Sequence, residues 1–219
     1  MTHDDVERFI REHTVVRRVP FLPEIVMHTA DEAIPLWEKT EELWEKTEVR
    51  TGAANLAPPF WAFPWAGGQG LARYVLDHPG LVHGKDVLDL AAGGGLVAIA
   101  AVRAGAASVI ANEIDPYADA AIALNAEANG LEIRRELRDL LDGATDADVV
   151  LAGDVFYSGA MAARMLAFMR RATGATVLVG DPGRAYAPAG MDELATYDVP
   201  VIRDLEDADT KRVRILRIA

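Results

Sequence analysis

The sequence predicts an α/β protein whose sheet is mostly parallel. Short apolar strand patterns alternate with helical patterns along most of the chain, which is typical of a parallel sheet covered by helices on both faces. A glycine-rich turn at 91–95 joins one of these strands to a helix of small residues. The chain ends in two strand-like runs with no helical pattern between them, and these predict a closing antiparallel hairpin.

The N-terminal part of the chain, residues 1–58, is predicted to be a helical extension packed on a main domain of residues 59–219. Residues 4–11 have a helical pattern, whereas two prolines keep 19–29 extended or irregular. The composition of 51–59 is typical of a loop and marks the boundary. We expect the two parts to form one structural unit.

A short tandem repeat lies inside this extension, where LWEKTEE is followed directly by LWEKTEV. The seven-residue spacing places two leucines and two tryptophans on one helical face: Leu36, Trp37, Leu43 and Trp44. Two copies are too few for a coiled coil, so we interpret the tryptophans as core residues. A protein-docking surface is the alternative.

The main domain is predicted to alternate strands and helices. The expected parallel strands are 86–90, 108–113, 132–137, 148–152 and 176–180. The expected helices are 69–77, 96–104, 117–129 and 159–173, the last three ending at Gly105, Gly130 and Gly174. The closing hairpin is expected from 195–202 and 212–218, joined by an acidic connection.

Composition narrows the class of protein. The 219 residues carry 22 Lys and Arg against 34 Asp and Glu, and this net charge of −12 argues against nucleic acid and mildly favours a basic partner. The absence of cysteine excludes disulfides, cysteine-ligated zinc and thiol nucleophiles. No apolar run reaches the roughly 18 residues of a membrane span, and the acidic start is unlike a secretory signal. We expect a soluble, cytoplasmic, monomeric protein without a membrane partner.

The glycine turn predicts a nucleotide-like cofactor but does not identify it. Gly93, Gly95 and Ala98 match G-x-G-x-x-A, and Glu113 follows Gly93 by 20 residues, as in dinucleotide-binding folds. Three observations argue against a dehydrogenase. Asp89 stands inside the strand, where it could pair with the ammonium of a methionine-type cofactor. No Tyr-x-x-x-Lys or suitably placed histidine supplies the proton donor that hydride transfer needs. About 85 residues precede the strand that begins at Asp86, and with the closing hairpin this is unlike most dehydrogenase domains. Together with the closing hairpin, these features resemble the seven-strand S-adenosylmethionine (SAM) methyltransferases, which are Rossmann-like.

In that interpretation, the turn is a D-x-G-x-G-x-G motif made of Asp89, Ala91, Gly93 and Gly95, with alanine in place of the first glycine. Glu113 ends the second strand and could accept both ribose hydroxyls, because a carboxylate has two oxygens. Asp115 is the alternative for this role, and Asp139 could bind the adenine amino group. The sequence offers no ligand cluster for a metal.

The segment after the fourth strand is the candidate acceptor site. Asp154 and Tyr157 form Asp-x-x-Tyr at the carboxyl edge of the sheet, where ligands bind in such folds. An anion beside an aromatic ring suits a cationic ammonium, whereas an amide acceptor would favour N-P-P-Y. The alternative is that Asp154 only caps the next helix, although Ser158 is an equally good cap.

Six segments carry a closer resemblance: WAFPWAGGQGLARYVLDHP, VLDLAAGGG, NEIDPYA, LNAEANG, GDVFY and VLVGDPGRAY. In this order and spacing they resemble the lysine methyltransferases of the electron transfer flavoprotein β subunit, a family of seven-strand enzymes with an Asp-x-x-Tyr motif. The resemblance covers roughly residues 15–190. It implies SAM as methyl donor and that β subunit as the protein substrate.

The resemblance also implies residue roles. Asp154 and Tyr157 would form the catalytic motif, with Asp154 also next to the cofactor. Trp65 and a turn at Gly67 and Gly68 would help enclose SAM, and the segment 180–184 would shape the lysine entrance. We interpret Asp154 as a group that orients the incoming ammonium. Two alternatives remain: a methyltransferase for a ribosomal protein or another amine, and a SAM- or nucleotide-binding protein without turnover.

Overall fold

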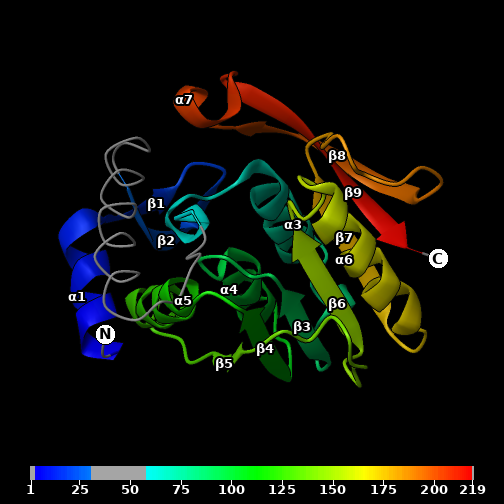
Figure 1. The fold of residues 1–219 in the computed structure, drawn as a ribbon, viewed down its shortest axis with the longest axis horizontal. Helices are drawn as coiled ribbons and strands as arrows, with labels where there is room; N and C mark the ends of the chain where they lie inside the picture. The colour runs from blue at the N-terminus through cyan, green and yellow to red at the C-terminus, as the bar shows by residue number, and fades with distance from the viewer. Residues whose placement is uncertain (1–2, 31–57, 219) are drawn as a thin grey trace.

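The computed structural model describes residues 3–30 and 58–218 and is built around a seven-stranded sheet (Figure 1). The strand order is β5-β4-β3-β6-β7-β9-β8. The first five of these strands are parallel, and β9 pairs antiparallel with both β7 and β8. This arrangement confirms the predicted fold class.

The elements of the parallel region follow the predicted alternation. The strands are β3 (Asp86–Leu90), β4 (Ser108–Glu113), β5 (Arg134–Leu137), β6 (Val149–Gly153) and β7 (Thr176–Asp181). The helices are α3 (Ala66–Asp77), α4 (Leu96–Arg103), α5 (Pro116–Ala128) and α6 (Gly159–Arg171), with 3-10 turns η1 (Phe60–Ala62) and η2 (Pro79–Leu81). Within the described ranges, no helix combines the length and the apolarity that crossing a bilayer requires.

Alternating side chains of the central strands enter two different cores. Val87 and Leu151 belong to the core shared with α3 and α4, whereas Leu88 and Val150 pack with residues of α6. Because successive strand residues point to opposite faces, a strand buried on both faces must be apolar at nearly every position. The sequence of β6, VVLAG, has this composition. The central strands are therefore fixed from both sides, which holds their carboxyl ends in place.

The N-terminal region contains a hairpin that the sequence analysis missed. Helix α1 (His3–His13) is followed by β1 (Val15–Val19) and β2 (Leu22–Thr29), which pair antiparallel. The expected helix is present, and the extended conformation expected within 19–29 is confirmed by β2, but β1 and its pairing with β2 were not predicted. Pro20 occupies the turn and Pro23 the start of β2, and both positions tolerate a missing N–H. The tandem repeat and most of the predicted boundary lie outside the described residues.

The C-terminal hairpin is present as predicted, but its connection differs. Strands β8 (Asp192–Pro200) and β9 (Thr210–Ile218) pair antiparallel. Between them lies a one-turn helix, α7 (Arg203–Glu206), where the prediction had no helix. Four residues are too few to give a periodic pattern. Glu206 on this turn is buried, so α7 faces the interior of the protein.

Candidate active site

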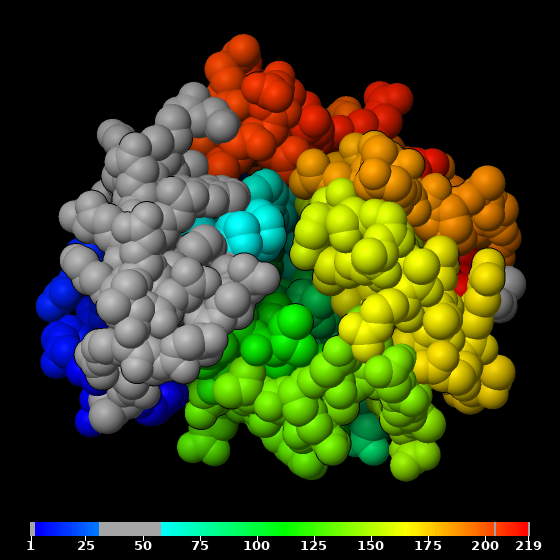
Figure 2. Space-filling model, viewed as in Figure 1, coloured from blue at the N-terminus to red at the C-terminus, as the bar shows by residue number. Residues whose placement is uncertain are grey.

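A cavity of about 590 Å³ opens where the parallel strands end, and Figure 2 shows it as a hollow between the cyan, green and yellow segments. This is the edge at which open α/β sheets bind ligands. The walls are mostly apolar. The cavity brings together many of the predicted site residues: Trp65, Ala91, Gly93, Glu113, Asp115, Asp139, Asp154 and Tyr157.

The glycine turn has left-handed backbone at three positions. The φ angles are +56° at Ala91, +56° at Gly93 and +81° at Gly95. Gly95 begins α4 and is buried against Ile122, so it shapes the turn from behind and does not line the cavity. At Ala91 the same conformation costs roughly 1–2 kcal/mol, because its Cβ approaches the next carbonyl. The motif position that departs from glycine is therefore strained.

Asp89 lies within β3, as the sequence predicts. Its side chain is buried behind the turn, outside the cavity wall, and its carboxylate accepts the Ala98 N–H at 2.8 Å. Burial raises the pKa of Asp89 to about 7, against the lowering effect of that hydrogen bond. Through this bond Asp89 fixes the start of α4. Its pairing with a cofactor ammonium stays a prediction.

Glu113 ends β4 and faces the cavity. One of its oxygens accepts the Gly93 N–H at 2.7 Å, and the other accepts the Ile114 N–H at 3.0 Å. Burial raises the pKa of Glu113 to about 7, although both hydrogen bonds oppose this shift. Each carboxylate oxygen keeps a second lone pair. Glu113 can therefore hold the glycine turn and still accept hydroxyl donors.

The two other predicted acids at this end of the cavity differ from each other. Asp115 caps α5 by accepting the Tyr117 N–H at 2.8 Å, and burial raises its pKa to about 6. Asp139 is exposed, and its bond to Arg164 at 2.8 Å holds the pKa of Asp139 below its usual value. Both line the cavity, so their proposed roles toward ribose and adenine stay predictions.

Asp154 follows β6 with a left-handed backbone, φ +62°. Its carboxylate accepts the Gly67 N–H at 3.1 Å and two N–H groups of Arg184, at 2.5 and 3.1 Å. It does not cap the following helix, because Ser158 does so by accepting the Met161 N–H. The structure therefore removes the capping explanation and leaves Asp154 as a buried carboxylate at the cavity wall.

Gly67 and Gly68 lie in the first turn of α3, and not in a turn before it as expected. Packing requires glycine at Gly67, where a Cβ would come within 2.4 Å of the Gly180 carbonyl oxygen, and at Gly153, where a Cβ would come within 2.7 Å of the Gly68 Cα, whereas a Cβ on Gly68 would meet nothing within 4 Å. Neither Gly67 nor Gly68 lines the cavity. The absence of side chains at Gly67 and Gly153 lets the start of α3 touch the ends of β6 and β7, where the Gly67 N–H reaches Asp154.

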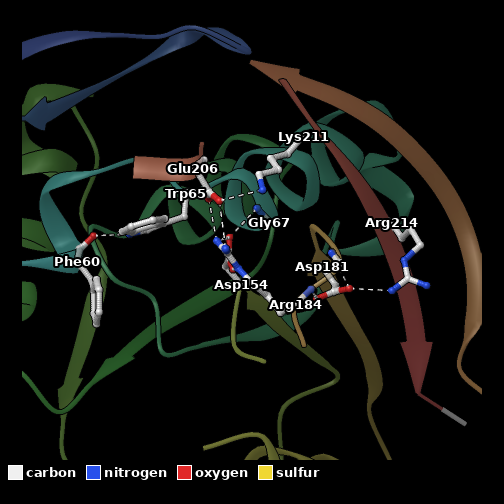
Figure 3. Close-up of polar contacts among 10 residues, drawn as sticks. Phe60, Trp65, Gly67, Asp154, Asp181, Arg184, Glu206, Lys211 and Arg214 are labelled. Atoms are coloured by element: carbon white, nitrogen blue, oxygen red, sulfur yellow. Dashed lines mark hydrogen bonds and ion pairs between the residues drawn. The ribbon is translucent and has the colours of Figure 1, made fainter. Parts of the chain in front are cut away.

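Arg184 is the residue that the sequence analysis underestimated (Figure 3). It lines the cavity, binds Asp154 and also donates to Glu206 of α7 at 2.7 and 3.1 Å. Lys211 of β9 lies 3.7 Å from the same Glu206. Burial opposes the charge of Arg184, but its bonds to both carboxylates outweigh burial and raise its pKa. Since these partners are far apart in the chain, no local motif indicates them.

Aromatic side chains complete the wall beside Asp154. Tyr157 is 47% exposed at the cavity, with its ring centroid 5.6 Å from that of Phe60. Burial and the charges of Glu113 and Asp154 raise the pKa of Tyr157, so its phenol stays protonated at neutral pH. Trp65 donates its indole N–H to the Phe60 carbonyl at 2.8 Å, and the Arg184 guanidinium lies 6.0 Å from its ring centroid.

Asn125 supports the glycine turn and was not singled out from the sequence. It is fully buried on α5, donates to the Gly94 carbonyl at 2.8 Å and accepts the His28 N–H at 2.7 Å. It therefore links the N-terminal hairpin to the turn. A single asparagine within a helical pattern gives no signal of such a role.

The donor set of the cavity fits an adenosyl cofactor. A volume of about 590 Å³ with mostly apolar walls is suited to a ligand of that size. Glu113 offers acceptors for two hydroxyls, and Gly93 lies at the wall where backbone must approach a ligand closely. Over residues 3–30 and 58–218, no group of three His, Cys, Asp or Glu side chains is arranged to hold a metal ion.

The fold and the site together define a class I SAM-dependent methyltransferase. The seven-stranded sheet, with its antiparallel strands at one edge, has structural neighbours among solved methyltransferases. A putative RNA methyltransferase from Pyrococcus horikoshii superposes with a TM-score of 0.53, covering 82% of this chain and 94% of its own, at 18% identity. At that identity the likeness concerns the fold alone.

Sequence relatives narrow the class further. The electron transfer flavoprotein beta subunit lysine methyltransferase of Danio rerio is 38% identical over 190 residues, 84% of this chain and 70% of the relative. The Homo sapiens protein of the same name is 38% identical over 82% of this chain and 67% of the relative. Residues 74–155 also match the family described as Ribosomal protein L11 methyltransferase (PrmA). The chain belongs to the electron transfer flavoprotein beta subunit lysine methyltransferase family, and it is a SAM-dependent protein-lysine methyltransferase.

Proposed function

We propose that this chain transfers methyl groups from SAM to lysine side chains of the β subunit of electron transfer flavoprotein. The names of its relatives support this substrate. The observation that carries the proposal is the position of Asp154 and Tyr157 at the wall of the cavity that Glu113 also lines. Glu113 ends β4 and Asp154 follows β6, and these two strands flank β3, so about 10 Å separates the two strand ends. One cavity can thus hold a donor and an acceptor.

On the donor side, Glu113 binds the ribose hydroxyls, and Trp65 and the glycine turn enclose the rest of the cofactor. When bound, SAM supplies a methyl group on a sulfonium. A nucleophile attacks the methyl carbon in line with the departing sulfur. The cavity wall around this position is mostly apolar. Asp89 acts behind the turn, where it holds the N-terminal end of α4.

On the acceptor side, the lysine nitrogen must present a lone pair. A free lysine has a pKa of about 10.4, so deprotonation at pH 7 costs on the order of 4–5 kcal/mol. Asp154 has about four acceptor positions, and Gly67 and Arg184 occupy three of them. The remaining position orients the incoming amine, Tyr157 packs beside it, and the released proton leaves to water.

A ribosomal protein is the second candidate substrate. The family match to ribosomal protein L11 methyltransferases and a 47% identity over 74 residues to the Salmonella arizonae protein favour it. The family match ends at Val155, before Tyr157 and Arg184. It includes the glycine turn, Glu113 and Asp154 but not the rest of the acceptor side, so it supports the donor more than the acceptor.

The test is methylation of purified electron transfer flavoprotein by this chain and SAM, followed by mass spectrometry of the β subunit. We expect added mass in steps of one methylene, located on lysine side chains. Ribosomal protein L11 serves as the competing substrate in a parallel reaction. Methylation of L11 alone would replace the proposed substrate. Calorimetry that detects binding of a nicotinamide dinucleotide, and not of S-adenosylhomocysteine, would contradict the cofactor.

A further inference from the structure

The acceptor side of the cavity contains a cluster of four charged side chains, here called the acceptor cluster: Asp154, Arg184, Glu206 and Lys211 (Figure 3). Two are acids and two are bases, so their formal charges cancel. The side chains of Asp154 and Glu206 are 7% and 4% exposed, whereas that of Arg184 is 23% exposed and lines the cavity. The cluster therefore presents a compensated carboxylate to the acceptor, not a free anion.

Charge balance matters here because the reaction consumes an uncharged amine. A free carboxylate beside a lysine stabilises the ammonium, which binds well but cannot act as a nucleophile. A guanidinium at the same position disfavours the ammonium. A carboxylate paired with a fixed cation can still accept a hydrogen bond in a defined direction. Its negative electrostatic potential at a neighbouring group is largely cancelled by the cation.

From this geometry we propose that Arg184 is a positioning residue that compensates the charge of Asp154, so that the site orients the substrate amine while favouring its uncharged form. The inference rests on the proposed function, since it concerns the lysine acceptor. In the transfer, the nitrogen lone pair forms the new N–C bond, the S–C bond breaks with its electrons on sulfur, and the amine proton goes to water.

Other groups around Arg184 do not replace this role. Asp181, at the end of β7, is engaged by Arg214 of β9 at 2.8 Å and accepts the backbone N–H groups of Gly183 and Arg184. Tyr157 contributes a protonated phenol, and Trp65 an aromatic face. Of the cluster, Lys211 contacts Glu206, while only Arg184 binds Asp154 directly.

Glu206 explains how Arg184 is held without giving up its charge. Its two oxygens bind the guanidinium from the side of α7 while Asp154 binds it from β6. Two carboxylates around one arginine fix the guanidinium plane, because the fork geometry of arginine matches carboxylates. The one-turn helix α7 thus connects the hairpin β8–β9 to the acceptor position.

The test is the pH profile of single-turnover methylation of the flavoprotein β subunit. Arg184→Met removes the charge and keeps the volume, whereas Arg184→Lys keeps the charge. We expect Arg184→Met to raise the apparent pKa for transfer by about one unit, with a rate about tenfold lower at neutral pH that recovers in alkali. Arg184→Lys should restore most of the profile. Arg214→Met, which removes a comparable arginine from Asp181 outside the cavity, should leave the apparent pKa unchanged.

A purely structural role for Arg184 would lower the rate equally at every pH, and that result would overturn the inference. A second measurement needs no substrate. The phenol of Tyr157 senses the charge of Asp154, so its titration, isolated by subtracting the absorbance of Tyr157→Phe, should move to higher pH in Arg184→Met. An unmoved titration also overturns the inference. If wild-type protein leaves the β subunit unmethylated at all pH values, the proposed substrate fails, and the Tyr157 titration still tests Arg184.

Discussion

Most acids at or behind the cofactor end of the cavity have different partners from Asp154 at the acceptor end. Asp89, Glu113 and Asp115 receive backbone N–H groups and form no ion pair with a residue of the described ranges, whereas the exposed Asp139 pairs with Arg164. At the acceptor end, Asp154 is paired with Arg184. Burial accordingly raises the pKa of each of the three donor-side acids to between about 6 and 7.

This difference indicates what each end must bind. A carboxylate without a cation beside it can accept hydrogen bonds from neutral hydroxyl groups. These bonds stabilise its ionised form, and no salt bridge competes with them. An amine nucleophile requires the reverse, since an uncompensated anion would keep it protonated. The same residue type therefore serves two purposes, and the neighbouring cation decides which.

The largest effect is expected from Asp154→Asn. Asparagine tolerates the left-handed backbone of this position, so the fold should persist. Misplacing the acceptor should lower methyl transfer on the order of 100-fold. Affinity for S-adenosylhomocysteine, measured by calorimetry, should stay within about twofold if the two ends are independent. Undiminished turnover would end the assignment of Asp154.

Glu113→Gln tests the other end. Loss of a charged acceptor for two hydroxyls should weaken S-adenosylhomocysteine binding by at least about tenfold, since hydrogen bonds to charged groups contribute roughly 1.5–3 kcal/mol each. Asp139→Asn is the comparison, because Asp139 is exposed and paired with Arg164 and should matter less. Equal losses in the two variants would contradict a special role for Glu113.

The pH dependence of cofactor binding sharpens the contrast further. Glu113 has a pKa of about 7 in the protein alone and must be ionised to accept two hydroxyls, so binding releases a proton. The affinity for S-adenosylhomocysteine should reach its full value above pH 7. It should fall by about tenfold as the pH is lowered from 8 to 6. Calorimetry across this range measures it. A slope that survives in Glu113→Gln would assign the titration to another group.

The smallest expected effect concerns the turn between the two ends. Ala91→Gly should raise the free energy of unfolding by about 0.5–1 kcal/mol, because the left-handed strain it relieves exceeds the entropy that glycine adds to the unfolded chain. Ala92→Gly is the matched control: Ala92 has no positive φ, so the change should destabilise by a similar amount. Urea denaturation of both variants gives the values. A destabilised Ala91→Gly would mean that the methyl group packs favourably.

Much of the fold could be predicted because its signals are local. The strands buried on both faces are continuous apolar runs, and the observed bounds of β3 and β4 coincide with those expected. The N-terminal hairpin escaped because prolines at strand ends resemble breakers until the pairing partner is known. The one-turn helix α7 is too short to have a period.

The candidate site could be predicted only where one segment carries it. Glu113 reaches the cavity from the end of β4 and Tyr157 from the loop after β6, and both line it. The bond from the Ala98 N–H to Asp89 was not predicted, because the sequence does not show which way an acid within a strand faces. Arg184 was assigned only a general role at the entrance, because its partners Asp154 and Glu206 lie 30 and 22 residues away in the chain.

The bond network of Asn125 has a further consequence. This one side chain ties β2 to the Gly94 carbonyl. Met27 of β2 also packs against the loop, because its Cε would be only 2.7 Å from a Cβ on Gly94. The first hairpin is therefore part of the cofactor loop's support, although it precedes that loop by some sixty positions. Truncating the chain to its central sheet would leave the loop without its brace, and cofactor retention would report on the integrity of the N-terminus.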